Sequence, residues 1–154
     1  MSDRLLLDAM LGKLTTYLRM CGYDATYVLD GVDDPMDGPT DAEVLTNARR
    51  SDRTILTRDR DLAAHADDAL LLRSRDVEAQ LSELRAAGYD LSLDATPTRC
   101  GACNGAVRAV DAGESLPAYA PDPAETDCWR CRSCGQVFWK GSHWDDVRAT
   151  IESL

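Results

Sequence analysis

The stretch Thr54-Ile55-Leu56-Thr57-Arg58-Asp59-Arg60-Asp61-Leu62 joins an apolar run, typical of a buried strand, to two carboxylates that each have arginine beside them. A second apolar run, Leu5-Leu6-Leu7-Asp8, also ends in an acid. In open α/β sheets, active sites form just beyond the carboxyl ends of the strands. We therefore expect Asp8, Asp59 and Asp61 to converge on one crevice at the edge of a parallel sheet.

Strand-like and helix-like segments alternate through the first part of the chain. Apolar runs predict strands, and apolar residues at helical spacing predict helices. The predicted strands are Arg4–Leu7, Ala25–Leu29, Thr54–Leu56 and Ala69–Leu72, the predicted helices are Leu11–Met20, Thr40–Arg50, Asp61–Ala66 and Asp76–Ala87, and a loop is predicted at Gly31–Pro39. This alternation favours an α/β fold with a mostly parallel sheet. The continuous apolar strands agree with helices on both faces of that sheet.

The composition changes near residues 94–98, where a segment rich in Cys, Gly and Pro begins. We expect an α/β domain over residues 1–94, a cysteine-rich ribbon over residues 95–141 and a final helix over residues 142–154. The ribbon segment has few long aliphatic side chains, so it cannot build a core alone. It therefore needs another source of stability.

Four cysteines in two Cys-x-x-Cys pairs predict a tetrahedral zinc site in this ribbon. They are Cys100, Cys103, Cys131 and Cys134. Four thiolates leave no open position on the ion, so the zinc is expected to be structural. Cys128 could pair with Cys131 instead, but Gly135 directly after Cys134 favours the pair Cys131 and Cys134. Disulfides are disfavoured in a reducing cytosol.

The acids after the first and third strands are candidates for a second metal site. Clustered carboxylates repel one another when ionised, and cations relieve that repulsion. Oxygen-only ligands select Mg²⁺ or Mn²⁺, so Asp8, Asp59 and Asp61 are candidate ligands and catalytic residues. Asp41 and Glu43, at the start of a predicted helix, are two further catalytic candidates. Glu43 also matches a capping box, and Asp61 could cap the next helix.

Five basic side chains are candidate substrate contacts, because lysine, arginine and histidine bind phosphate groups. They are Lys13, Arg58, Arg60, Lys140 and His143. In the segment Trp139–Trp144, the tryptophans could also stack on bases. The alternative is that these rings pack the ribbon against the α/β domain, while Ser142 caps the last helix.

Acids outnumber bases by 27 to 17 in the 154 residues, which gives a net charge of -10, and the only lysines are Lys13 and Lys140. An acidic, lysine-poor surface is typical of proteins from a salt-rich cytoplasm, so we expect a halophilic source. Nucleic-acid binding normally draws on basic patches. At molar salt, however, the Debye length is only about 3 Å. Local contacts from arginines and metal ions then decide whether nucleic acid binds, so the net charge does not exclude RNA as a substrate.

The sequence also predicts a cytoplasmic protein without a membrane partner. No apolar run reaches the length of a membrane span. The first four residues lead straight into a strand-like run rather than a signal peptide. Nothing in the composition specifies an oligomeric state.

Several of these segments together resemble the PIN-like ribonucleases, and closely the branch known as the Mut-seven C-terminal RNase domain. The matching segments are Asp8–Leu14, Leu18-Arg19, Gly22–Asp24, Leu56–Leu62, both Cys-x-x-Cys pairs and Trp139–Trp144. The resemblance implies a PIN-like three-layer fold with a C-terminal zinc ribbon. It also implies metal-dependent RNA cleavage by an acidic set, namely Asp8, Asp59, Asp61 and either Asp41 or Glu43. Cys128 and the insert at Gly31–Pro39 depart from the family pattern.

The leading hypothesis is therefore a Mg²⁺- or Mn²⁺-dependent ribonuclease in which a metal-bound water attacks an RNA phosphodiester. The alternative is a non-catalytic RNA- or protein-binding module that uses the zinc ribbon. A phosphatase-like hydrolase is disfavoured, because no Asp-x-Asp pair follows the first strand.

Overall fold

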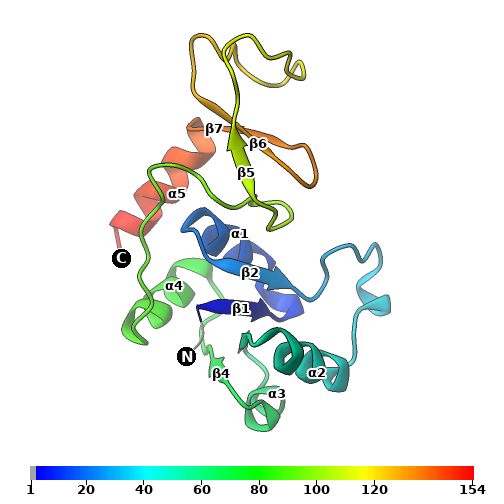
Figure 1. Ribbon diagram of the computed structural model, residues 1–154. Helices are drawn as coiled ribbons and strands as arrows, with labels where there is room; N and C mark the ends of the chain where they lie inside the picture. Colours follow the sequence, from blue (N-terminus) through cyan, green and yellow to red (C-terminus); the bar gives the residue numbers. More distant parts are fainter. Residues whose placement is uncertain (1–2) are drawn as a thin grey trace.

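The computed structural model describes residues 3–154, and a sheet of four parallel strands forms the centre of its first part (Figure 1). The strands are β1 (Arg4–Leu7), β2 (Asp24–Tyr27), β3 (Thr54–Thr57) and β4 (Ala69–Leu71). Their order across the sheet is β2-β1-β3-β4, and every neighbouring pair runs parallel. The predicted α/β class with a parallel sheet is confirmed. β2 ends at Tyr27 rather than at Leu29 as predicted.

Helices cover both faces of this sheet. They are η1 (Ala9–Leu11), α1 (Gly12–Met20), α2 (Asp41–Ser51), α3 (Arg60–His65), α4 (Val77–Ala86) and α5 (Ser142–Glu152). A short 3-10 helix, η2 (Pro35–Asp37), buries no residue and lies in the loop between β2 and α2. Leu5 and Leu7 lie in one core with side chains of α1, α4 and α5, whereas Leu6 lies in a second core with α2 and α3. Successive strand residues face opposite sides of a sheet. The uninterrupted leucine run of β1 therefore serves both cores of a three-layer fold.

The cysteine-rich segment forms a separate antiparallel sheet, the ribbon, beside α1 and β2 (Figure 1). Its strands are β5 (Val107–Ala109), β6 (Cys128–Cys131) and β7 (Val137–Trp139), in that order across the sheet. From the ribbon the chain returns as α5, which joins the core beside α4. The last helix thus belongs to the α/β core and not to the ribbon.

Buried polar contacts attach the ribbon to the α/β part. Arg19 of α1 is only 3% exposed, and its guanidinium donates hydrogen bonds to the carbonyl oxygens of Ala25 (2.8 Å) and Gly101 (3.2 Å). The same group pairs with Asp30 at 2.8 Å. Asn104 Oδ1 accepts the amide hydrogen of Ala25 at 3.0 Å. The ribbon thereby covers part of the open edge of β2, which would otherwise be free to pair with another strand.

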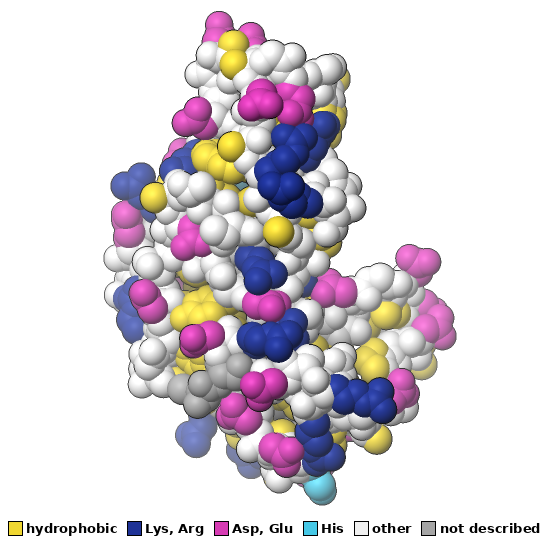
Figure 2. All heavy atoms as spheres, viewed as in Figure 1, with side chains coloured by type: hydrophobic (Ala, Val, Ile, Leu, Met, Phe, Trp, Pro, Cys, Tyr) yellow, Lys and Arg dark blue, Asp and Glu magenta, His cyan; other side chains and the backbone are white. Residues whose placement is uncertain are grey.

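The surface carries charges of both signs. Figure 2 shows acidic and basic side chains interspersed over one face, with no single acidic tract. Within residues 3–154, no helix is long and apolar enough to cross a membrane. The halophilic source and the cytoplasmic location stay predictions.

Candidate functional site

The ends of β1 and β3 meet through one hydroxyl group. Thr57, the last residue of β3, is fully buried, and its Oγ1 donates a hydrogen bond to Asp8 Oδ2 at 2.6 Å. The same oxygen accepts the amide hydrogen of Asp59 at 2.9 Å. A threonine hydroxyl has one hydrogen to donate and two lone pairs to accept with. The bridge therefore sets Asp8 and the backbone of Asp59 in one fixed relationship.

Asp59 also holds the start of α3. Its Oδ1 accepts the amide hydrogens of Asp61 (2.9 Å) and Leu62 (3.3 Å), which makes Asp59 the N-cap of α3. The prediction that Asp61 could cap this helix is wrong, because the helix begins one residue earlier, at Arg60. Within residues 3–154, Asp59 Oδ2 and the exposed carboxylate of Asp61 form no hydrogen bond. Both remain available for a ligand.

The two acids at the start of α2, Asp41 and Glu43, differ in the hydrogen bonds of their carboxylates. Glu43 forms the predicted capping box, since its amide donates to Thr40 Oγ1 at 3.2 Å and its Oε1 accepts the amide hydrogen of Thr40 at 3.4 Å. Asp41 is exposed in the first turn, and in the described part of the chain its carboxylate has no such bond. The carboxylate of Asp41 is therefore the freer of the two.

The donor chemistry of this edge fits a hard divalent cation. Asp8 and Asp59 supply carboxylate oxygens at adjoining strand ends. Mg²⁺ usually keeps several waters and takes one or two protein carboxylates, together with substrate phosphates. Among residues 3–154, the acids do not form a group of three with ligand atoms all within 4.8 Å of one another. The predicted convergence of Asp8, Asp59 and Asp61 on one ion therefore stays a prediction.

Tyr27 supports the segment that follows β1. Its hydroxyl donates a 2.5 Å hydrogen bond to the carbonyl of Ala9, the residue after Asp8. Burial raises the pKa of Tyr27, and the charges of Asp30 and Asp8 raise it further. An added Cβ at Gly12 would lie 3.2 Å from the tyrosine hydroxyl, so this close approach favours glycine. The tyrosine thus stays a neutral donor that fixes the turn after β1.

Three arginines line a cavity of about 300 Å³ at the ends of β3 and β4. This arginine cavity is lined by Arg58, Arg60, Leu71, Leu72 and Arg73. The Nε of Arg58 is buried without a hydrogen-bond partner, and within residues 3–154 none of the three guanidinium groups forms an ion pair. Guanidinium groups bind phosphate through paired hydrogen bonds. The cavity is therefore suited to an anion.

Arg73 was not among the residues predicted from the sequence. It directly follows the apolar run that ends with Leu72, just as Arg58 follows the run that ends with Thr57. The rule that sites form beyond the carboxyl ends of strands could have found it. Thr57 had no such signal, because a threonine at the end of a strand is ordinary. Lys13 lies exposed in the first turn of α1.

The four predicted cysteines form one cluster. All four Sγ atoms lie within 4.8 Å of one another, with Cys100 and Cys134 at 3.7 Å and Cys103 and Cys131 at 3.5 Å. Zinc bound to four thiolates at 2.3 Å would place the sulfurs about 3.8 Å apart. Cys128 lies outside this cluster, and its Sγ contacts the carbonyl of Thr126 instead. The cluster thus contains Cys131 and Cys134 and not Cys128, and their role as zinc ligands stays a prediction.

The backbone around Cys131 favours a thiolate. Burial alone would raise the pKa of Cys131, but the amide groups of Cys134 and Ser133 point at its Sγ and help to lower the pKa to about 7. A Cβ at Gly105 would lie 2.8 Å from the same sulfur, so only glycine leaves room there. These features fit a site for a soft divalent metal such as zinc.

Residues 3–151 match the family model described as Mut7-C RNAse domain. The chain belongs to this family. A comparison with curated proteins and a comparison with solved structures gave no match. The family match includes the α/β part, the ribbon and nearly all of α5, so the resemblance inferred from the sequence motifs is confirmed.

Two residues of this Mut7-C domain that were predicted to contact the substrate lie in a different place from Asp8 and Asp59. Lys140 and His143 line a cavity beside the ribbon, and α1 contributes Thr16, Arg19 and Met20 to the same cavity. The prediction that Ser142 caps the last helix is wrong. Gly141 is the N-cap of α5, and no side chain caps this end.

Proposed function

We propose that this Mut7-C domain is a metal-dependent ribonuclease that hydrolyses RNA phosphodiester bonds at the carboxyl edge of its parallel sheet. The observation that carries the proposal is the Thr57 bridge between Asp8 and Asp59 at the ends of β1 and β3, together with the arginine cavity at the ends of β3 and β4. Carboxylates that hold a cation next to guanidinium groups that hold a phosphate form the arrangement that phosphoryl transfer needs.

Asp8 and Asp59 are the residues that would hold Mg²⁺ or Mn²⁺. When bound, such an ion lowers the pKa of a water and neutralises charge on the phosphoryl oxygens. Thr57 orients Asp8 through Oδ2. The other carboxylate oxygen of Asp8, Oδ1, accepts the amide hydrogen of Ala9 at 2.8 Å. Asp61 and Asp41, both exposed, are the carboxylates available to accept a proton from the attacking water.

The arginines and Lys13 orient the substrate. Arg58 has a buried Nε without a partner, and a phosphate oxygen in the arginine cavity would satisfy it. Leaving such a group without a partner is costly, so anion binding is favoured at this point. Lys13, exposed in the first turn of α1, adds a basic side chain on the helix that follows Asp8 and η1.

The cysteine cluster has a structural part in this proposal. Four sulfur ligands complete the coordination of zinc and leave no position for a reacting water. The cluster instead fixes the loop of Gly101 and Asn104, both of which contact the α/β part. Zinc at this site therefore stabilises the ribbon and its attachment to β2.

The test is cleavage of a labelled single-stranded RNA while Mn²⁺ is titrated into the wild type, Asp8→Asn and Asp59→Asn. Loss of a metal-holding carboxylate is expected to lower the rate by about 100-fold or more. Asp37→Asn, an exposed acid in η2, is the matched control and should cleave like the wild type. Cleavage by Asp8→Asn at the wild-type rate would overturn the proposal.

A non-catalytic RNA-binding module is the second candidate, and the aromatic cavity beside the ribbon is the observation that favours it. RNA binding without cleavage at any Mn²⁺ concentration, unchanged in Asp59→Asn, would favour this candidate over the ribonuclease.

A further inference from the structure

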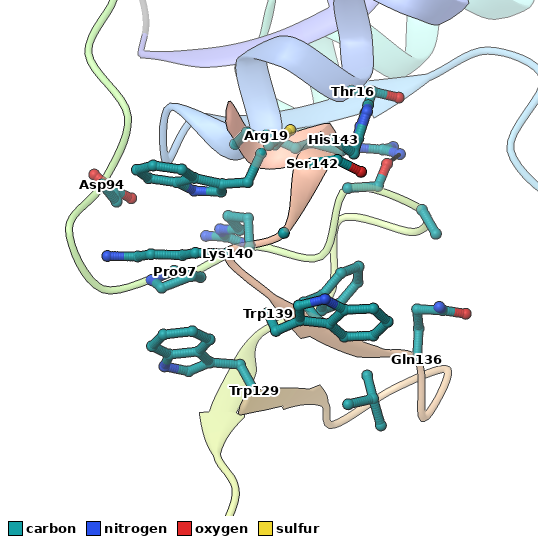
Figure 3. A pocket seen from close by; sticks show the side chains of 18 residues that line it. Thr16, Arg19, Asp94, Pro97, Trp129, Gln136, Trp139, Lys140, Ser142 and His143 are labelled. Atoms are coloured by element: carbon teal, nitrogen blue, oxygen red, sulfur yellow. Dashed lines mark hydrogen bonds between the residues drawn. The ribbon is translucent and has the colours of Figure 1, made fainter. Parts of the chain in front are cut away.

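All three tryptophans of the chain line one cavity of about 580 Å³ (Figure 3). The cavity lies between β6 and β7 of the ribbon, the second half of α1 and the first turn of α5. Its volume is in the range of pockets that take small ligands. We call it the tryptophan cleft, and its main members are Trp129, Trp139, Trp144, Arg99, Lys140 and His143.

The aromatic rings of the cleft are not sealed inside a core. Trp129 is 8% exposed, whereas Trp139 and Trp144 are half-buried. Trp139 stacks on Tyr119 with ring centroids 6.3 Å apart, and Tyr119 is 52% exposed. Clustered aromatic surface that stays in contact with water marks binding sites. The prediction that the rings only pack the ribbon against the α/β part therefore explains their position but not their exposure.

Lys140 occupies the place of a cation between two of these rings. Its Nζ lies 4.9 Å from the ring centroid of Trp144 and 5.9 Å from that of Trp129. Within residues 3–154, Lys140 forms no ion pair with a carboxylate. Aromatic cages bind quaternary ammonium ligands through the same contact. In this protein Lys140 itself takes the place of the cationic ligand beside the rings. The cleft therefore suits a ligand that has flat aromatic rings and negative charge.

The charge of the cleft contrasts with that of the whole protein. The chain carries a net charge of -10, yet among residues 3–154 Asp94 is the single acid that lines the cleft. Its Oδ2 already accepts a hydrogen bond from Thr98 at 3.0 Å. Lys140 lies in the same cavity as this carboxylate (Figure 3), whereas the guanidinium of Arg99, which also lines the cavity, lies 3.8 Å from Asp24. Lys140 is in no ion pair of the described residues and therefore gives the cleft a local positive charge, which complements an anionic ligand.

One face of α1 leads from the cleft toward the carboxylates. Thr16 and Met20 line the cleft, and Lys13 precedes Thr16 by one helical turn on the same face. Residues three and seven positions apart share a helix face. At 1.5 Å per residue, the nine residues of α1 span about 14 Å between the η1 end beside Asp8 and the cleft. A chain of a few nucleotides would cover this length.

We propose that the tryptophan cleft binds unpaired nucleobases of single-stranded RNA, which stack on its indole rings while Lys140 contacts an adjacent phosphate. The proposal rests on the proposed function, because it gives the ribonuclease an anchor for the strand that runs along α1 to Asp8. Bases in a duplex are already stacked on each other, so only single-stranded or unpaired nucleotides can use the cleft.

Because all three tryptophans line the cleft, intrinsic tryptophan fluorescence reports its occupancy directly. Single-stranded RNA, the same strand in a duplex, and an abasic strand of equal length are titrated into zinc-loaded Asp8→Asn protein without added Mn²⁺. Anisotropy of labelled RNA is measured in parallel. We expect saturable quenching by the single strand, and affinity weaker by roughly ten-fold or more for the duplex and the abasic strand.

Two charge-reversal variants separate the cleft from general electrostatics. Lys140→Glu should weaken binding of the single strand by about ten-fold, whereas Arg50→Glu makes the same charge change on the exposed end of α2 and should bind like the wild type. Lys140 is exposed, and circular dichroism checks that its variant folds. Equal loss in both variants, unchanged tryptophan emission, or equal binding of the abasic strand would overturn the proposal. Equal quenching by poly-glutamate would overturn it in favour of an acidic protein partner.

The cleft and the ribonuclease can fail separately. Quenching by single-stranded RNA in a protein that cleaves no RNA with Mn²⁺ would support the cleft and contradict the proposed function. Cleavage by a wild type whose tryptophans do not respond to RNA would contradict the cleft and leave the ribonuclease in place.

Discussion

Asn104 of the ribbon donates a 2.7 Å hydrogen bond to Asp24 of β2, so the cysteine-bearing loop is joined directly to the edge of the parallel sheet. The same carboxylate oxygen accepts a 2.8 Å hydrogen bond from Arg53, whose side chain is only 8% exposed. Burial alone would raise the pKa of Asp24, but the hydrogen bonds from Arg53 and Asn104 help to lower it from 3.8 to about 2. The contact therefore depends on an ionised carboxylate.

Acid should weaken this contact in a defined range of pH. A carboxylate with a lowered pKa stabilises the fold above its unfolded pKa, and this contribution is lost as the pH falls through the folded pKa. The contribution of Asp24 is on the order of 2 kcal/mol and should disappear between about pH 4 and pH 2. Asp24→Asn should therefore be less stable at neutral pH, with a free energy of unfolding that changes less over that range. Urea unfolding at stepped pH measures both. Metal loss from the cysteines affects both the wild type and Asp24→Asn, so the decisive quantity is the difference between their free energies of unfolding. Parallel pH profiles of the two proteins would contradict the prediction.

Thr57→Val should impair cleavage while the protein stays folded. The variant keeps the shape of the side chain but removes the donor to Asp8 and the acceptor for the amide of Asp59. Partners that orient metal ligands are worth about 10- to 100-fold in activity, so we expect a loss of that size and rescue by Thr57→Ser. Thr15→Val is the matched control, because Thr15 is as buried as Thr57 and its hydroxyl donates to the carbonyl of Leu11, four residues earlier, rather than to an acid. A comparable loss of activity in Thr15→Val would point to general destabilisation.

Arg73→Gln should weaken RNA binding rather than slow the chemical step. Removing one phosphate contact should raise KM several-fold and reduce the slope of log affinity against log salt by about one. Arg75→Gln is the control two residues further on. Arg75 is exposed and lies outside the arginine cavity. Steady-state cleavage at several salt concentrations tests the pair. An unchanged salt slope in Arg73→Gln would show that no phosphate binds there.

Cysteine substitutions should separate the metal ligands from the extra cysteine. Cys100→Ser removes one of the four clustered sulfurs and should abolish stoichiometric zinc and destabilise the ribbon. Cys128→Ser should keep one zinc per chain, because Cys128 is equally buried but lies outside the cluster. Elemental analysis of the purified proteins reads out both results. Zinc loss in Cys128→Ser, with zinc retained in Cys134→Ser, would reverse the ligand assignment.

Local features of the fold could be predicted from the sequence. The leucine run of β1 and the run Thr54–Leu56 were predicted as buried strands, because short continuous apolar segments bury both faces of a parallel strand. The capping box of Thr40 and Glu43 was also predicted, since its partners are only three residues apart. The cap of α3 was misplaced by two residues, because Asp59 and Asp61 have the same side chain and only the backbone turn after Thr57 distinguishes them.

The sequence by itself determined the order of strands and helices, the four cysteines that cluster and the acids that follow the strands, because these depend on periodicity and on short spacings along the chain. The tertiary structure alone decided how distant segments combine. Thr57 reaches Asp8 across 49 positions, and Arg19 reaches Gly101 across 82. The gathering of all three tryptophans against α1 is of the same kind. Such contacts depend on the directions of side chains after the layers have packed, and no local pattern encodes those directions.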